Sequence, residues 1–354
     1  MPGPIAVRTL TDGGQRAEEV AEELVAFLGA ARSRLDLALY DVRLPGAVGD
    51  AVAGAVRAAA RRGVAVRIAF NAEEAEERPR AFPPPPRTEP ELLDTLGVPL
   101  RGIPEEPDLM HHKYAVRDGD AVWTGSANWT LDSWTRQENV LVTLTSPGIA
   151  AAYTRDFDAL WSSGRVQGTG DFDVPPVDVA GTAARAWFCP GRGEQLSHRI
   201  AKAIGAARRR VRIASPVLTA GPILGTLAEV VAEDRVDLAG ICDGPQVEQV
   251  FAQWQANPRS AWKAPLLARV LEDGAFTGKP STPWAPGRVH DYMHAKVTVA
   301  DDTVFCGSFN LSRSGEQNAE NVLELRDAAL ADRLAAYIDG LRARYPNRIE
   351  PPTP

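Results

Sequence analysis

Two short stretches of the chain carry the same set of reactive side chains. The first, residues 110–130, reads MHHKYAVRDGDAVWTGSANWT, and the second, residues 293–310, reads MHAKVTVADDTVFCGSFN. Each stretch places a histidine two positions before a lysine: His111 with Lys113, and His294 with Lys296. An imidazole can attack an electrophile or move a proton, and an ammonium group can stabilise negative charge. Each pair therefore fits chemistry at an anionic group.

The sequences YAV and VTV that flank these pairs predict β-strands, in which residues i and i+2 point to the same face. The histidine and lysine of each pair are then expected to share a face. His112 is expected to point to the opposite face, and we interpret it as a structural neighbour. Only one histidine of the adjacent pair is predicted to act chemically.

Each stretch continues through a short turn into Gly-Ser-X-Asn. The glycine permits close backbone approach, and serine and asparagine supply neutral donors that suit a phosphoryl oxygen. The predicted phosphate-binding residues are Ser126, Asn128, Ser308 and Asn310. Ten residues after each asparagine stands a glutamate, Glu138 or Glu320, and a carboxylate there can hold an imidazole in one orientation.

The order HxKx4D followed by GSxN resembles the signature of the phospholipase D superfamily, and the resemblance spans nearly the whole chain. Six residues separate Asp118 from Gly125 in the first copy, and five separate Asp301 from Gly307 in the second. The resemblance implies an α/β fold with two similar phospholipase D-like α-β-α sandwich domains. These domains are expected to be related by a pseudo-twofold axis, with one active site at their interface.

The same resemblance implies a mechanism and a set of catalytic residues. One histidine attacks phosphorus and becomes a phosphohistidine, and the other protonates the leaving oxygen and then activates water or an alcohol. We favour His111 as the nucleophile and His294 as the acid and base, with the reverse assignment open. The expected catalytic residues are His111, Lys113, His294, Lys296, Glu138 and Glu320. No metal and no cofactor are expected, and the aspartates of the motif are expected to be structural.

The two halves of the chain also repeat outside the motifs. Gly29 and Gly205 lie 176 residues apart and Asn128 and Asn310 lie 182 apart, a nearly constant offset that indicates duplication. Hydrophobic periodicity predicts strands at 5–10 and 184–188, helices from about 16 and over 194–207, and closing strand–helix units with helices over 147–162 and 328–344. We predict domains 1–168 and 169–354, joined by a Gly- and Pro-rich linker over 164–183.

Composition limits the function further. A net charge of −7 gives no basic footprint of the kind that non-specific nucleic-acid binders carry, which weakens a nuclease function without excluding it. Three cysteines without a CxxC pair argue against a disulfide framework and a zinc site. The N-terminus shows no signal-peptide pattern, and no stretch approaches the length of a membrane span. We therefore expect a cytoplasmic monomer.

Three functions from different classes follow. The first is a phosphodiesterase acting on a phospholipid or a small phosphodiester. The second is a metal-independent nuclease of the same superfamily, and the third is a binding or scaffold protein without turnover. Two segments that precede the motifs, residues 82–90 and residues 247–290 with their three tryptophans, are predicted to overhang the site and set substrate choice.

Overall fold

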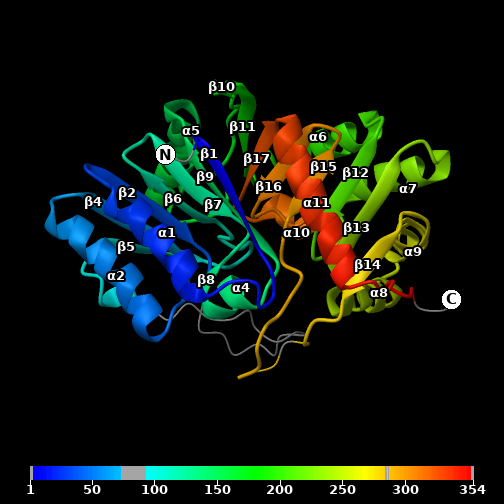
Figure 1. Ribbon diagram of the computed structural model, residues 1–354, viewed down its shortest axis with the longest axis horizontal. Coiled ribbons are helices and arrows are strands. Elements are labelled where there is room, and N and C mark those ends of the chain that lie inside the picture. The colour runs from blue at the N-terminus through cyan, green and yellow to red at the C-terminus, as the bar shows by residue number, and fades with distance from the viewer. Residues whose placement is uncertain (1–2, 73–92, 284, 286, 352–354) are drawn as a thin grey trace.

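The computed structural model describes residues 3–72, 93–283, 285 and 287–351 of the chain. Its centre is a pair of mixed β-sheets, one in each half of the sequence (Figure 1). The strands of the first sheet, in spatial order, are β1 (Ile5–Leu10), β9 (Asn139–Thr145), β7 (Ala121–Gly125), β6 (Lys113–Arg117), β2 (Arg34–Leu39), β4 (Ala65–Ala72) and β5 (Leu100–Pro104).

The second sheet repeats this order and adds a short strand at one edge. Its strands, in spatial order, are β10 (Val177–Val179), β11 (Thr182–Cys189), β17 (Glu320–Arg326), β16 (Thr303–Gly307), β15 (Val297–Ala300), β12 (Arg210–Ala214), β13 (Asp237–Asp243) and β14 (Phe276–Lys279). In the first sheet four antiparallel pairings are followed by two parallel ones. The second sheet shows the same series once its added β10–β11 pairing is set aside. Identical order and direction confirm the predicted duplication.

Helices cover both faces of each sheet. The outer faces pack against α1 (Ala17–Gly29) and α2 (Gly46–Arg61) in the first half, and against α6 (Gly193–Ala206) and α7 (Gly221–Glu233) in the second. The inner faces pack against α5 (Pro147–Ser163) and α11 (Ala328–Arg344), which lie between the sheets (Figure 1). The predicted pair of α-β-α sandwiches is confirmed.

One hydrophobic core joins the two halves. It combines apolar side chains of α5, such as Phe157, with those of α11, such as Ile338, and with the inner faces of both sheets. Hydrogen bonds add to this contact, because the Tyr337 hydroxyl on α11 donates to the carbonyl of Leu10 on β1 at 2.8 Å. Burial of this shared apolar surface fixes the halves relative to each other, and this fixed arrangement allows side chains from both halves to form one site.

Short elements follow the GSxN sequences. The helices α4 (Leu131–Thr135) and α10 (Arg313–Gln317) start directly after the two motifs, and β3 (Val42–Arg43) pairs with β8 (Trp129–Thr130). The side chains of Thr130 and Ser312 cap the N-termini of α4 and α10 by accepting backbone N–H groups. These caps fix where the two helices begin, shortly after each GSxN sequence.

The connection between the halves is less extended than the sequence predicts. The predicted linker, residues 164–183, contains β10 and the start of β11, so its second part is a hairpin added to the edge of the second sheet. The predicted boundary after residue 168 falls in the segment between α5 and β10.

The second half carries an insertion before its motif, built from α8 (Gly244–Ala256), the 3₁₀ turn η1 (Ala261–Lys263) and α9 (Ala264–Asp273). Its Trp254 is buried in the core, whereas Trp262 is exposed. Trp284 and the predicted loop 82–90 lie outside the described residues. Among the described residues, no helix is long and apolar enough to cross a membrane.

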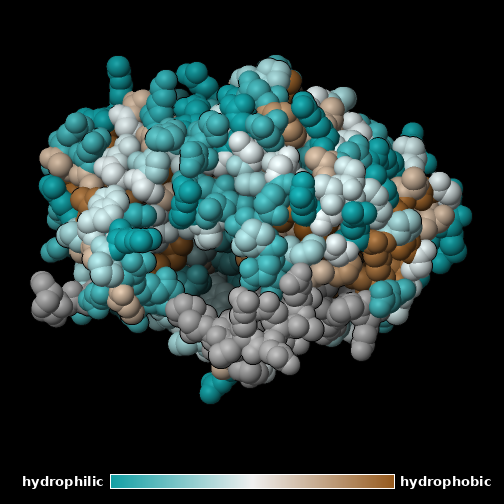
Figure 2. Space-filling view, turned by 180° about the vertical axis from the view of Figure 1, so that it is seen from behind, coloured by the Kyte–Doolittle hydropathy of each residue, from teal (hydrophilic) through white to brown (hydrophobic). Residues whose placement is uncertain are grey.

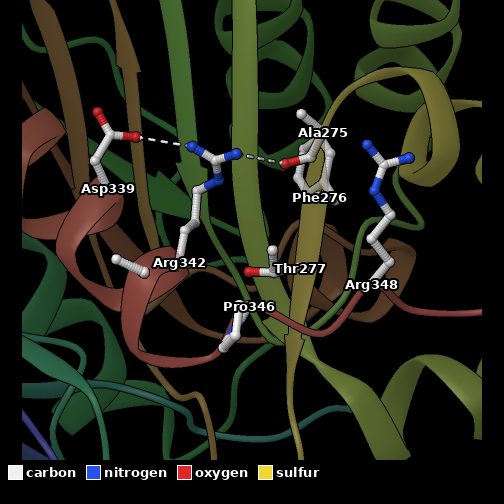
Figure 3. Close-up of a pocket in the computed structure, with 8 residues that line it drawn as sticks. Ala275, Phe276, Thr277, Asp339, Arg342, Pro346 and Arg348 are labelled. Atoms are coloured by element: carbon white, nitrogen blue, oxygen red, sulfur yellow. Dashed lines mark hydrogen bonds and ion pairs between the residues drawn. The ribbon is translucent and has the colours of Figure 1, made fainter.

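The C-terminal end of α11 is tied to β14, the last strand of the second sheet. Figure 3 shows Arg342 donating one hydrogen bond to Asp339, at 3.1 Å, and another to the carbonyl of Ala275, also at 3.1 Å. A cavity of about 350 Å³ beside it is also lined by Thr277 and Arg348. None of the predicted catalytic residues lines this cavity.

Candidate active site

The two motifs meet because each is paired with the opposite half. The N–H of His111 donates to the carbonyl of Ala319 at 3.0 Å, in the segment just before β17. The N–H of His294 donates to the carbonyl of Glu138 at 3.2 Å, just before β9. Both histidines therefore stand in extended segments immediately before β6 and β15, with their backbones fixed by the other half. Figure 2 shows a largely hydrophilic surface that is hollowed near its middle.

The imidazole of His111 is paired with a carboxylate from the second half. Its Nδ1 lies 2.7 Å from Oε1 of Glu320, and both side chains are buried. The ring of Tyr40 packs edge-on against the imidazole, with 4.6 Å between the ring centres. This orients the ring so that Nε2 is the nitrogen directed away from the carboxylate.

The imidazole of His294 has a different partner. Its Nδ1 lies 3.1 Å from Oδ1 of Asn139, while the side-chain amide nitrogen of Asn139 donates to the carbonyl of Ser133 at 3.0 Å. A carbonyl oxygen only accepts, so Nδ1 of His294 is the donor in this pair. The sequence predicted Glu138 in this role, and that prediction is wrong.

The carboxylate of Glu138 points away from both histidines. It accepts a hydrogen bond from Nζ of Lys279 at 2.6 Å and one from the Tyr345 hydroxyl at 2.9 Å. Asp12 adds a second carboxylate, 3.5 Å from Nζ of Lys279. This cluster joins the N-terminal segment, β14 and the end of α11. Glu138 therefore holds these three parts of the chain together and does not orient a histidine.

A shift of one residue explains the difference. In the antiparallel pairings Gly125 lies opposite Leu141, and Gly307 lies opposite Val322. The glycines are 182 residues apart but their partners are 181 apart, because three residues separate α4 from β9 and only two separate α10 from β17. Asn139 therefore occupies the position equivalent to Glu320. Since neighbouring side chains of an extended strand point to opposite faces, Glu138 is turned away.

The serines of the GSxN sequences hold the partners of the histidines. The Ser126 hydroxyl donates to Oδ1 of Asn139 at 2.7 Å, and the Ser308 hydroxyl donates to Oε2 of Glu320 at 2.5 Å. Each serine oxygen also accepts a backbone N–H from the adjacent strand, at 2.9 and 3.0 Å. The sequence predicted these hydroxyls as phosphate ligands. In the structure they donate their hydrogen bonds to the side chains of Asn139 and Glu320 instead.

The asparagines of the same sequences are differently placed. The side-chain oxygens of Asn128 and Asn310 are both buried, and neither has a hydrogen-bond partner in the described part of the chain. Two equivalent amides in the same condition indicate polar groups held ready for a ligand, because buried polar groups in folded proteins are nearly always paired. These unpaired oxygens accept hydrogen bonds, as phosphate oxygens also do, so a contact to phosphate would have to come from the amide nitrogens, and phosphate binding by Asn128 and Asn310 stays a prediction.

The two lysines are the cations of the site. The side chain of Lys113 is 1% exposed and that of Lys296 is similarly buried; each ammonium donates to the carbonyl of its own motif histidine, at 2.6 and 2.7 Å. Burial lowers the pKa of Lys113 to about 7, and burial together with the charge of Lys113 lowers the pKa of Lys296 well below its usual value. Two buried lysines, one of which lowers the pKa of the other, favour the entry of an anion that would restore their charged forms.

Burial also governs the other titratable groups. It lowers the pKa of both His111 and His294, with further lowering by the charges of the two lysines. It raises the pKa of Glu320 to about 8, against the opposing effect of Lys113 and the hydrogen bond from Ser308. Such perturbed groups gathered in one place are typical of functional sites.

The aspartates of the motif shape turns at the far end of the motif strands. Asp118 and Asp301 both adopt positive φ, at 52° and 50°. The carboxylate of Asp118 accepts backbone N–H groups of residues 32–34, and that of Asp301 accepts those of residues 208–210. These bonds tie each turn to the preceding helix–strand junction, in agreement with the structural role expected for them.

Several positioning residues carry no sequence signal of their own. Asn71, near the end of β4, accepts the N–H of Met110 at 3.0 Å, and Asp243, at the end of β13, accepts the N–H of Met293 at 2.9 Å. Because the two are equivalent in the repeated sheets, superposing the halves of the sequence by strand order would have pointed to them. His112 is fully buried, 3.0 Å from Asp156, as expected of a structural neighbour.

A sequence model of the family described as "Cardiolipin synthase, PLD-like domain" matches residues 24–161 and 200–342 of this chain. The chain belongs to this phospholipase D-like family. The two matched ranges fall one in each half of the sequence, in agreement with duplication, and leave β1, β10 and β11 outside. No cluster of three or more histidine, cysteine, aspartate or glutamate side chains suited to a metal ion occurs among the described residues of this phospholipase D-like protein.

Similar proteins include mitochondrial cardiolipin hydrolases. The one from Xenopus laevis is 34% identical over 139 residues, which are 39% of this chain and 59% of that protein. The one from Homo sapiens is 27% identical over 184 residues, which are 49% of this chain and 67% of that protein. The matched region thus spans only about three fifths of the Xenopus protein.

Two solved structures share the fold of this phospholipase D-like chain over nearly its whole length. The phosphatidylserine synthase of Haemophilus influenzae Rd KW20 superposes with a TM-score of 0.65 at 14% identity, covering 96% of this chain and 86% of the other. The polyphosphate kinase of Porphyromonas gingivalis gives 0.60 at 13% identity, covering 96% and 47%. At these identities the likeness concerns the fold alone.

Proposed function

We propose that this protein is a phosphodiesterase that cleaves a phospholipid phosphodiester through a phosphohistidine, passing the phosphatidyl group to water or to an alcohol. The observation that carries the proposal is the pairing of His111 with Glu320 of the opposite half, at 2.7 Å. It stands beside a second histidine, His294, held in the same way by a different group. The cardiolipin hydrolases among the similar proteins support a phospholipid as the substrate.

The two partners favour different roles for the two histidines. When Nε2 of an imidazole is phosphorylated while Nδ1 keeps its proton, the ring carries a positive charge, and a carboxylate at Nδ1 stabilises that charge. Glu320 provides this carboxylate to His111. The amide of Asn139 cannot neutralise a cation, so protonated His294 gives up its Nε2 proton more readily, as a general acid must. We therefore assign His111 as the nucleophile and His294 as the acid and base.

The first step then runs as follows. Binding of the anionic phosphodiester favours the protonated form of His294, which then carries protons on both ring nitrogens. Nε2 of His111 attacks phosphorus, the bond from phosphorus to the leaving oxygen breaks, and the Nε2 proton of His294 passes to that oxygen. In the second step water or an alcohol attacks phosphorus, its proton passes to His294, and the bond between phosphorus and His111 breaks. Lys113 and Lys296, with the amides of Asn128 and Asn310, stabilise the charge on the non-bridging oxygens.

The test is a substrate panel combined with trapping of the intermediate. Purified protein is assayed on phosphatidylglycerol and cardiolipin vesicles, on single-stranded DNA and on bis-p-nitrophenyl phosphate. Quenching with base during turnover should yield a peptide containing His111 that carries an acid-labile, base-stable phosphoryl group. Turnover of DNA with none of lipid would replace the phospholipid function with a nuclease function. A label on His294 would reverse the two roles.

A further inference from the structure

Few large apolar side chains are exposed in the part of the chain that the structure describes, and each of them is connected to one of the two motifs. Among the residues that the structure describes, three stand out: Trp262 is 58% exposed, Val289 is 42% exposed and Leu131 is 38% exposed. Single exposed apolar residues need no explanation, but a group at one edge of a functional site does.

Leu131 and Val289 lie together beside the first motif. Leu131 is the first residue of α4, which starts three residues after Asn128. Val289 is followed by His290, whose N–H donates to Oδ2 of Asp132, the residue after Leu131, at 3.2 Å. The segment that leads into the second motif therefore runs alongside the helix that follows the first one.

Trp262 is tied in a similar way to the second motif. The neighbouring Lys263 donates from Nζ to the carbonyl of Thr219 at 3.3 Å, and the N–H of Thr219 donates to the carbonyl of Leu311 at 2.7 Å. Leu311 directly follows Asn310. In Figure 1, α4, α8 and the orange segment that leads to Met293 all lie along the lower edge of the molecule.

Cationic side chains accompany these apolar ones. Nζ of Lys263 lies 5.8 Å from the centre of the Trp262 ring, and Arg259 and Arg288 are exposed in the same two segments. An exposed tryptophan next to lysine and arginine is the combination found where proteins meet the surface of a bilayer. Basic residues near an anionic bilayer are attracted to it.

We propose that Leu131, Val289 and Trp262 form a docking edge that seats the protein on an anionic phospholipid surface. Leu131 and Val289 lie beside the first motif and Trp262 is tied to the second, so the site would open toward the headgroups where phosphodiesters lie. The proposal rests on the proposed function and adds a peripheral contact to it: the apolar side chains enter the boundary between headgroups and acyl chains, and the basic ones remain among the phosphates.

The test uses the full chain with all three residues changed, Leu131→Ser, Val289→Ser and Trp262→Ser. Co-sedimentation is measured with phosphatidylcholine vesicles and with vesicles in which phosphatidylglycerol replaces part of the phosphatidylcholine. We expect the wild-type protein to prefer the anionic vesicles and the triple variant to bind them at least about tenfold more weakly. Hydrolysis of soluble bis-p-nitrophenyl phosphate should be unchanged, because none of the three side chains belongs to the site.

Trp262→Phe is the matched control, because it keeps an apolar ring and should retain most of the binding. Equal binding by the wild-type protein and the triple variant overturns the docking edge. So does wild-type protein that hydrolyses the soluble diester but binds no vesicle, an outcome that leaves the chemistry standing. Conversely, vesicle binding that the triple variant loses, without turnover of any diester, supports the docking edge and contradicts the proposed function. If the triple variant loses binding to single-stranded DNA while its vesicle binding is unchanged, the docking edge on lipid is overturned and the surface belongs to nucleic acid.

Discussion

The two histidines at the centre of the site are chemically unequal, although the motifs that carry them are nearly identical. His111 faces the carboxylate of Glu320, and His294 faces the amide of Asn139. Each partner is held in turn by a serine of its own half. A symmetric pair of motifs thus produces an asymmetric site, and this asymmetry allows the roles to be separated by experiment.

A substrate with a good leaving group separates them most directly. With bis-p-nitrophenyl phosphate the leaving p-nitrophenolate needs little protonation, so His294→Ala should still release it in a first-turnover burst. His111→Ala should release none, because no bond to phosphorus can form. On a phospholipid, whose leaving alcohol needs a proton, both variants should lose at least about 10²-fold in rate. Rapid-quench measurement on both substrates gives the result, and a burst from His111→Ala alone would exchange the roles.

The two glutamates should also behave differently. Glu320→Gln removes the carboxyl group that ionises to stabilise phosphorylated His111, so kcat should fall by about 10²-fold with little change in stability. Glu138→Gln leaves the buried ammonium of Lys279 without its main partner, so the free energy of unfolding should fall by about 3 kcal/mol. Urea unfolding and steady-state kinetics on the same two preparations make the comparison. A catalytic defect in folded Glu138→Gln as large as that of Glu320→Gln would contradict the one-residue shift.

Anion affinity should depend on pH in a direction set by the buried lysines. The pKa of Lys113 is lowered to about 7, so this side chain loses its positive charge as the pH rises through that value. The pKa of Glu320 is about 8, so its ionisation adds negative charge over the same range. Tungstate inhibition should therefore weaken above about pH 7, by up to about tenfold per pH unit for each proton involved. Inhibition constants from about pH 6 to about pH 9 test this, and tighter inhibition at high pH would refute it.

At the scale of elements, the sequence predicts the strands and helices that carry the motifs but not their pairing register. The repeated ENV of residues 138–140 and 320–322 makes the two glutamates look equivalent, and only the pairing of β7 with β9 shows that Asn139 takes the place of Glu320. One additional residue after α4 causes the shift. Pairing register depends on contacts between distant strands, so a count along the chain does not reveal it.

The turn aspartates give a prediction at this scale. Asp118→Ala or Asp301→Ala removes a carboxylate that accepts several backbone N–H groups at a helix–strand junction. Each should lower the free energy of unfolding by about 1–2 kcal/mol, as the loss of a capping side chain does. The kcat of folded protein should be nearly unchanged, because neither carboxylate reaches the histidines. Thermal melts and kinetics at low temperature check both statements, and a large loss of kcat without loss of stability would give these aspartates a catalytic role.

At the scale of the molecule, the constant offset between the halves predicted two similar domains, and the resemblance to the phospholipase D superfamily implied a shared site. It could not predict how the halves are held together. That depends on Phe157 and Ile338 in a common core and on Lys279, whose charge is neutralised by groups from distant parts of the chain. A lone lysine at the end of a strand has no pattern that distinguishes it from a surface residue. The substrate was also beyond prediction from the motifs, which report only that phosphorus is attacked.

The whole-molecule arrangement leads to a test of the covalent mechanism. If His111 carries the phosphatidyl group while His294 waits as a base, any small alcohol that enters the site competes with water for the same intermediate. Adding a primary alcohol should divert product from the phosphomonoester to the alcohol's phosphodiester, in proportion to its concentration. Release of the first leaving group should stay constant if the first step limits the rate. With a chiral thiophosphodiester the transferred product should keep its configuration at phosphorus, because two in-line displacements each invert it. Clean inversion would mean direct attack by the acceptor, and the paired histidines would then need another explanation.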